Sequence, residues 1–211
     1  MRVLVTGGSG SGKSRFAEGL CHRFGTPLVY IATMQPFGPD AAARIERHRA
    51  QRAGAGFVTV ERFGAYGALD LASAVEQSLA ARRVAGDATG LADGAGASTV
   101  LLECAGNICA NLQFSQDGQG GWVVLDDARE LAGRVLEGVR AIGSQCANLV
   151  VVSNEVGADG SSYATETKVY QRALGRANCL MAAEFDAVFE VAAGCAQALK
   201  LGGGSPEWMD A

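Results

Sequence analysis

Residues 7–14 read Gly7-Gly8-Ser9-Gly10-Ser11-Gly12-Lys13-Ser14, and they decide the fold class of this chain of 211 residues. Their spacing matches G-x-x-x-x-G-K-[ST], the phosphate-binding loop or P-loop. An apolar run over residues 2–6 precedes the loop, and Phe16, Ala17 and Leu20 follow it at helical spacing. A strand, a glycine-rich turn and a helix in this order are the context that the motif requires. The sequence therefore predicts a loop that binds the phosphates of ATP or GTP.

Each residue type in this loop has a use in phosphate binding. Glycines let successive backbone N–H groups turn toward phosphate oxygens, and the helix N-terminus adds the positive end of its dipole. We expect Lys13 to reach the β- and γ-phosphates as a catalytic residue, and the Ser14 hydroxyl to bind Mg²⁺. All of residues 7–14 are assigned to nucleotide binding.

Outward from the loop, short apolar runs alternate with helical patterns. The predicted strands cover residues 2–6, 28–32, 57–60, 98–102, 148–152 and 187–191. The predicted helices cover residues 14–23, 40–52, 69–83, 126–142 and 165–183. This alternation predicts an α/β fold of the P-loop NTPase type, with a mostly parallel sheet flanked by helices and an antiparallel edge hairpin at residues 197–201. We expect one domain over residues 1–211, with a glycine-rich loop at 115–121, a surface insertion at 84–97 and a flexible tail at 202–211.

Composition excludes several other classes of protein. Apolar residues make up 48% and charged residues 19%, which is typical of a globular protein. A net charge of −4 disfavours a nucleic-acid partner. No apolar run is long enough to span a membrane, and the N-terminus does not resemble a signal peptide, so we expect a cytoplasmic protein. Six cysteines without metal-like spacing are expected to be buried free thiols.

Two carboxylates follow predicted buried strands. Glu103 comes directly after Val100-Leu101-Leu102, and Glu155 follows the strand at 148–152. A P-loop enzyme holds its metal with an acidic residue at the end of a neighbouring strand. We therefore expect Glu103 to help bind Mg²⁺ and nucleotide; the alternative is an ordinary acidic residue at a strand end.

Arg44, His48 and Arg52 are each four residues apart on one predicted helix, so they share one face. Such a face could meet an anionic ligand, and a neutral histidine is a competent nucleophile toward phosphorus. The alternative interpretation is a solvated, charged helix face.

Together, these segments resemble the bifunctional adenosylcobinamide kinase and adenosylcobinamide-phosphate guanylyltransferase family. The similar segments are LVTGGSGSGKSRFAE at 4–18, VYIAT at 29–33, RIERHRAQR at 44–52, TVE at 59–61, LLEC at 101–104, Asn111-Leu112, SNEVG at 153–157 and GRAN at 175–178. Their order and spacing extend over most of the chain, and they are more specific than the P-loop alone.

The resemblance implies two reactions in cobalamin biosynthesis. The first phosphorylates adenosylcobinamide with ATP or GTP. The second transfers GMP from GTP to that phosphate through a phosphohistidine, which the motif places at catalytic His48, and yields adenosylcobinamide-GDP. The resemblance also implies nucleotide-binding roles for Arg44, Arg52, Thr33 and Glu61, a corrinoid substrate, and a homo-oligomer, in this family a trimer.

Two other functions remain open on the sequence alone. One is a P-loop kinase for another small molecule, in which His48 and its arginines only bind substrate. The other is a nucleotide-responsive binding module without turnover. Attachment of GMP to the protein distinguishes the bifunctional transferase from both.

Overall fold

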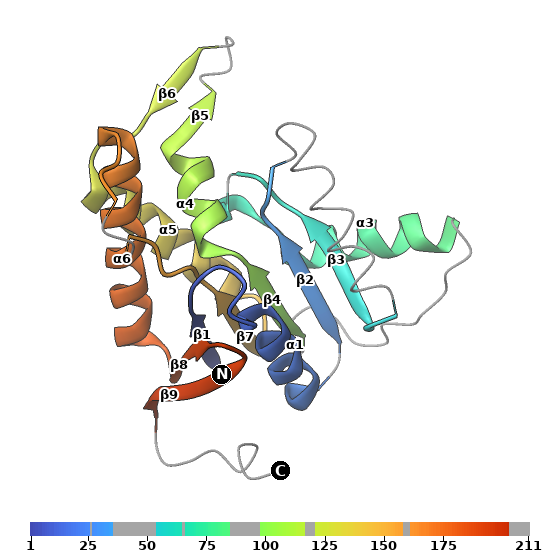
Figure 1. Cartoon of the computed structure of the whole chain (residues 1–211). Helices are drawn as coiled ribbons and strands as arrows, with labels where there is room; N and C mark the ends of the chain where they lie inside the picture. The colour runs from blue at the N-terminus through green and yellow to red at the C-terminus, as the bar shows by residue number, and fades with distance from the viewer. Residues whose placement is uncertain are drawn as a thin grey trace.

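A seven-stranded sheet forms the centre of the computed structural model (Figure 1), which describes residues 1–25, 27–35, 54–64, 66–84, 98–116, 121–157 and 161–202. The elements, in chain order, are β1 (Arg2–Thr6), α1 (Lys13–Phe24), β2 (Leu28–Ala32), β3 (Phe57–Glu61), the 3₁₀ turn η1 (Tyr66–Ala68), α3 (Leu71–Val84), β4 (Thr99–Glu103), α4 (Ala105–Gln113), β5 (Phe114–Gln116), β6 (Trp122–Val124), α5 (Ala128–Gly143), β7 (Asn148–Val152), α6 (Thr165–Glu184), β8 (Ala187–Ala192) and β9 (Cys195–Leu201).

The sheet has the strand order β3-β2-β4-β7-β1-β8-β9. Every neighbouring pair is parallel except β8 and β9, which form an antiparallel hairpin. The register aligns Glu61 with Ala32, Ala32 with Glu103, and Glu103 with Val152. The carboxyl ends of β3, β2, β4 and β7 therefore lie level with one another at one edge, where ligands bind in open α/β sheets. The predicted α/β fold is confirmed, including its C-terminal hairpin.

The two faces of the sheet bury separate apolar clusters. One cluster combines alternate strand residues such as Leu4, Ile31 and Leu102 with residues of α3, α4, α5 and α6. The other combines Val5 and Val152, among others, with the buried side of α1. The strands are apolar on both faces because both are covered, as is typical of parallel sheets.

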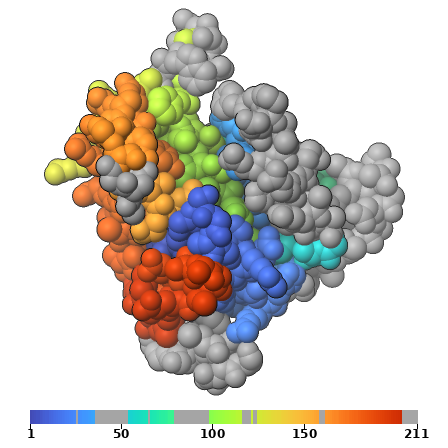
Figure 2. Space-filling view, viewed as in Figure 1, coloured from blue at the N-terminus to red at the C-terminus, as the bar shows by residue number. Residues whose placement is uncertain are grey.

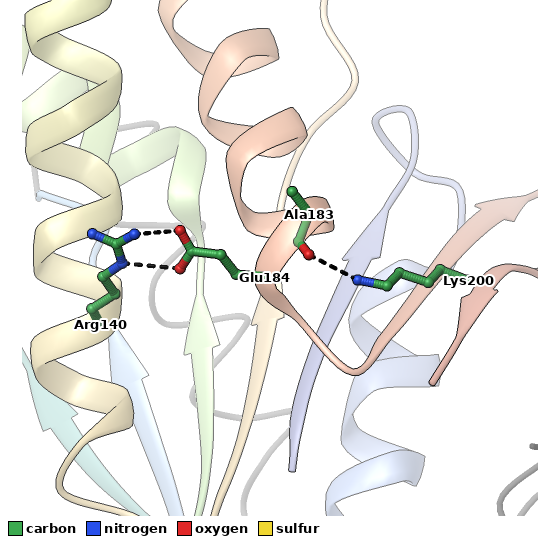
Figure 3. A network of polar contacts seen from close by, with 4 residues as sticks. All are labelled: Arg140, Ala183, Glu184 and Lys200. Carbon is green, nitrogen blue, oxygen red and sulfur yellow. Dashed lines mark hydrogen bonds and ion pairs between the residues drawn. The ribbon is translucent and has the colours of Figure 1, made fainter. Parts of the chain in front are cut away.

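Contacts at the C-terminal end of α6 join it to α5 and to the hairpin (Figure 3). Arg140 of α5 forms an ion pair with Glu184, the last residue of α6. Lys200 of β9 donates hydrogen bonds to the carbonyl oxygens of Ala182 and Ala183, at 2.9 and 3.0 Å. These carbonyls have no partner within the helix, and an ammonium group suits the negative end of its dipole.

Several predicted elements differ from the structure. Residues 105–113, for which no element was predicted, form α4. Part of the predicted loop at 115–121 belongs to the antiparallel β5–β6 hairpin, which projects beyond α4 (Figure 1). The helix predicted at 40–52 lies outside the described residues, as do 85–97 of the predicted insertion and 203–211 of the predicted tail. Gly202 of that tail donates a hydrogen bond to the Asp186 carbonyl at 2.7 Å.

The prediction for the cysteines is only partly right. Four thiols are free and buried, whereas two are free and exposed; the buried ones are Cys21, Cys104, Cys109 and Cys146, and the exposed ones are Cys179 and Cys195. Within the described residues, His, Cys, Asp and Glu form no cluster of three that could hold a metal ion. In the same part of the chain, no helix is both long and apolar enough to cross a membrane.

Candidate active site at the carboxyl edge of the sheet

The P-loop connects β1 to α1 through a backbone path that only glycines follow easily. Gly7, Gly10 and Gly12 have φ angles of 151°, 70° and 94°. A Cβ atom at Gly7 would lie 2.3 Å from the Val191 carbonyl oxygen, so the close approach of β8 excludes any side chain there. The predicted strand–loop–helix arrangement is thus present, and the loop is held against the neighbouring strand.

The β8–β9 turn forms one wall of the loop. The Gly194 N–H donates a 2.8 Å hydrogen bond to the Ser11 carbonyl oxygen. A Cβ atom at Gly12 would lie 3.2 Å from the Cα atom of Gly194. In Figure 2 the N-terminal segment, in blue, is bordered by the C-terminal hairpin, in red. The hairpin thus contributes to the shape of the phosphate-binding loop.

Lys13, the first residue of α1, has only 8% of its surface exposed. Its ammonium group donates a hydrogen bond of 3.0 Å to the Gly8 carbonyl oxygen on the other side of the loop. Gly8, Ser9 and Gly10 are exposed. The positive charge is therefore held over a loop whose outer side is open to a ligand.

Glu103 meets the P-loop from β4. The Ser14 hydroxyl donates to Glu103 Oε1 at 2.5 Å, and the Tyr30 hydroxyl donates to Oε2 at 3.2 Å. β7 separates β4 from β1 in the sheet, but α1 packs over both β7 and β4 and carries Ser14 to the carboxylate. A hydroxyl and a carboxylate are the oxygen donors with which P-loop proteins hold Mg²⁺.

Thr33 is fully buried and holds the backbone next to Glu103. Its hydroxyl accepts a 2.7 Å hydrogen bond from the Cys104 N–H and lies 2.8 Å from the Glu103 carbonyl oxygen, to which it donates. Asn111 of α4 donates to the Thr33 carbonyl at 2.8 Å and to the Tyr66 hydroxyl at 3.0 Å. The side chain of Thr33 therefore contacts backbone, and its predicted role in nucleotide binding stays a prediction.

Cys104 lies beside this network as a neutral thiol. Burial raises the pKa of Cys104 to about 11. Nearby backbone N–H groups and Lys13 lower this pKa, but their effect is smaller than that of burial. Since nucleophilic and metal-binding cysteines act as thiolates, a packing role suits this thiol at neutral pH.

Of the remaining predicted site residues, the structure describes Glu61. Glu61 is exposed at the end of β3, two strands from Glu103 at the same edge. Arg44, His48 and Arg52 lie outside the described residues, so their roles stay predictions. Tyr30 was not predicted, because it stands within the apolar run of β2 and only the folded sheet brings its hydroxyl to Glu103.

Known proteins resemble this chain over nearly its whole length. The family model described as cobinamide kinase / cobinamide phosphate guanyltransferase matches residues 3–199. The bifunctional adenosylcobalamin biosynthesis protein CobU of Escherichia coli K12 is 33% identical over 203 residues, covering 95% of this chain and 100% of that protein. CobU of Salmonella typhimurium is 30% identical with the same coverage. CobP of Pseudomonas aeruginosa is 31% identical over 157 residues, covering 74% of this chain and 73% of that protein.

These matches confirm the resemblance drawn from the motifs, and with it the predicted enzyme class. That class is a transferase that combines a kinase with a nucleotidyltransferase. The chain belongs to the cobinamide kinase / cobinamide phosphate guanyltransferase family.

Proposed function

We propose that this protein phosphorylates adenosylcobinamide and then converts the product to adenosylcobinamide-GDP in cobalamin biosynthesis. The observation that carries the proposal is the P-loop, with Lys13 over it and the Ser14–Glu103 pair beside it, in a chain of this family. The corrinoid is the partner molecule, and ATP and GTP are the nucleotide substrates.

In the kinase step, the aminopropanol hydroxyl of the corrinoid attacks the γ-phosphorus of ATP or GTP. The bond from that phosphorus to the β–γ bridging oxygen breaks, the nucleoside diphosphate leaves, and the hydroxyl proton is released. The loop N–H groups and Lys13 orient the phosphates and offset the charge that develops on them.

In the second step, a neutral ring nitrogen of His48 attacks the α-phosphorus of GTP, and pyrophosphate leaves. A phosphate oxygen of the corrinoid then attacks the phosphorus of the GMP group on the histidine; the new O–P bond forms, the N–P bond breaks and the imidazole is released. Arg44 and Arg52, which the sequence places on the same helix face, would offset charge on the transferring group. The assignment of the phosphohistidine to His48 rests on the sequence motif in which Arg44-Ile45 is followed by His48.

The donor set fits Mg²⁺. The Ser14 hydroxyl and a Glu103 oxygen lie 2.5 Å apart, and Tyr30 orients the second oxygen of the same carboxylate. Ser14 and Glu103 would hold the ion together with phosphate oxygens, because Mg²⁺ usually takes few protein ligands when it binds nucleotides. When bound, it would offset negative charge on the phosphates.

The deciding experiment uses GTP labelled at the α-phosphate, mixed with purified protein and Mg²⁺ in the absence of corrinoid. We expect label on the protein that is labile in acid and stable in base. His48→Ala should abolish the label while retaining kinase turnover with cobinamide, because its P-loop is intact. Lys13→Ala should abolish kinase turnover.

Other outcomes would favour the alternatives. A wild-type protein that phosphorylates cobinamide but never carries label would be a P-loop kinase without guanylyl transfer. A protein that binds GTP without any turnover would be a nucleotide-responsive binding module. Equal loss of both activities in folded His48→Ala would make His48 a substrate-binding residue instead.

We also propose that the protein is a cytoplasmic homo-oligomer, and the resemblance to its family implies a trimer. The location follows from the use of ATP and GTP as substrates. Phe114 and Val124 support the oligomer: they are cross-strand partners on the projecting β5–β6 hairpin, with 39% and 45% of their surfaces exposed. Light scattering during gel filtration should give a mass above that of one chain, and Phe114→Ser should lower it; a monomeric wild type would contradict the assembly.

A further inference from the structure

One side chain of α6 reaches across to the turn that follows β7. Asn178 Oδ1 accepts a 2.6 Å hydrogen bond from the Ser153 hydroxyl. Its Nδ2 donates to the Asn154 carbonyl oxygen at 3.3 Å. Most of the buried side of α6 packs in the apolar cluster opposite α1, so this contact connects that face of the sheet to the edge where the P-loop lies.

The same turn holds the P-loop by its backbone. The Ser153 N–H donates to the Val5 carbonyl in β1 at 2.9 Å, and the Glu155 N–H donates to the Gly7 carbonyl at 3.0 Å. Gly7 is the first glycine of the loop, and β8 already confines it from the other side. The path of Gly7 is therefore fixed between β8 and the turn at 153–155.

The turn is packed closely enough to transmit a change at α6. Ser153 is fully buried, so its hydroxyl would lose its partner if Asn178 were truncated. On the α4 side, a Cβ atom at Gly106 would lie 3.1 Å from Asn154 Nδ2 and 2.9 Å from the Tyr170 hydroxyl. With α4 this close, the turn has little room to move in that direction without breaking its bonds to β1 and Gly7.

We propose that Asn178 is a positioning residue for nucleotide binding. It acts through Ser153 and Asn154, whose turn sets the path of Gly7 and so the orientation of the loop N–H groups. This inference rests on the proposed function, because it assumes that residues 7–14 bind the phosphates.

The test measures nucleotide affinity separately from folding. The probe is a GTP analogue with a methylene group between the α- and β-phosphorus atoms, because attack at the α-phosphorus cannot release pyrophosphate from it. Its dissociation constant is measured by calorimetry in the presence of Mg²⁺. We expect Asn178→Ala to raise the dissociation constant roughly five- to tenfold, and Ser153→Ala to raise it in the same direction. Ser153→Ala removes only one hydroxyl, so it keeps the test decisive if Asn178→Ala folds poorly.

Asn148→Ala is the matched control. Asn148 lies at the amino end of β7, where its amide contacts Thr99 and the N-terminal amine, far from the carboxyl edge. It should lower the unfolding temperature without changing the dissociation constant. If folded Asn178→Ala and Ser153→Ala both bind the analogue like the wild type, the inference is overturned and the contact serves stability alone.

Lys13→Ala separates this inference from the proposed function. If Lys13→Ala loses the analogue while the Asn178 and Ser153 variants retain it, only the positioning role fails. If Lys13→Ala binds the analogue as tightly as the wild type, the P-loop assignment fails and the positioning role fails with it.

Discussion

Ser14 and Glu103 lie 89 positions apart in the sequence, and the Ser14 hydroxyl donates a 2.5 Å hydrogen bond to the Glu103 carboxylate. The pair joins the first turn of α1 to the last residue of β4 at the carboxyl edge of the sheet. Thr33, which follows the neighbouring strand β2, fixes the backbone of Glu103, so the carboxylate is presented to the P-loop from a rigid position.

Replacing Glu103 with glutamine tests its role in metal binding. The amide keeps the shape and an acceptor for Ser14 but removes the negative charge that attracts Mg²⁺. We expect kinase kcat to fall by about 100-fold and half-maximal activity to need more Mg²⁺. The measurement is kinase rate against Mg²⁺ concentration.

Glu76→Gln is the control for that experiment, because Glu76 is exposed on α3 and lies outside the proposed site. It should leave the Mg²⁺ dependence unchanged. An unchanged Mg²⁺ dependence in Glu103→Gln would show that Glu103 serves only as a structural partner of Ser14.

Gly7→Ala should destabilise the protein and weaken nucleotide binding. The new Cβ would meet the Val191 carbonyl oxygen at 2.3 Å, and backbone must shift to relieve the contact. Overpacking of this kind costs about 1–3 kcal/mol in the free energy of unfolding. Urea unfolding and GTP titration of the same sample measure both effects.

Gly19→Ala provides the opposite case within the helix that follows the loop. Gly19 is exposed in α1, and a Cβ there would meet nothing within 4 Å. Alanine should therefore stabilise the protein by about 0.5–1 kcal/mol through helix propensity. If Gly7→Ala lowered the free energy of unfolding no more than Gly19→Ala does, the result would contradict the close contact between the loop and β8.

The strands and the P-loop were predictable because their signals are local. The bounds of β2 and β7 agree with the predicted ranges 28–32 and 148–152, since each is a short apolar run between turns. The position of Glu103 also followed from the sequence, because parallel strands bring their carboxyl ends to one edge.

Other features depend on tertiary contacts that no local pattern contains. Cys104, the N-cap residue of α4, makes no side-chain cap hydrogen bond, and the helix includes a glycine and two asparagines, so its helix propensity is low. Ala105, Ile108 and Cys109 are nevertheless fully buried, and their packing stabilises the helix. The hydrogen bond between Asn178 and Ser153 could not be predicted from the sequence either, because only the fold brings these two residues together.

Two glycines of α5 should respond oppositely to alanine. A Cβ at Gly138 would lie 2.8 Å from the Cβ of Tyr66, which packs against α5 from η1, whereas one at Gly133 would meet nothing within 4 Å. We expect Gly138→Ala to cost about 1–2 kcal/mol of stability and Gly133→Ala to gain up to about 1 kcal/mol. Equal effects in denaturant unfolding would contradict the close packing of η1 on α5.

Asp127 should make part of the stability depend on pH. It is the N-cap of α5, and its carboxylate accepts hydrogen bonds from the backbone N–H groups of Arg129 and Glu130, at 2.7 and 3.2 Å. These bonds hold the pKa of Asp127 below its ordinary value. Its contribution is therefore complete above the pKa of the unfolded chain, about 4, and is lost as pH falls through the lower pKa of the folded state.

Asp127→Asn isolates that contribution, since asparagine also caps helices but does not titrate. The wild type should exceed Asp127→Asn in unfolding free energy at pH 7, and the difference should shrink as the pH is lowered from about 4 toward 2. Asp126→Asn removes the same charge one residue before the cap and serves as the control for the change in net charge. If the difference in unfolding free energy between the wild type and Asp127→Asn stayed constant with pH, the carboxylate would not cap α5.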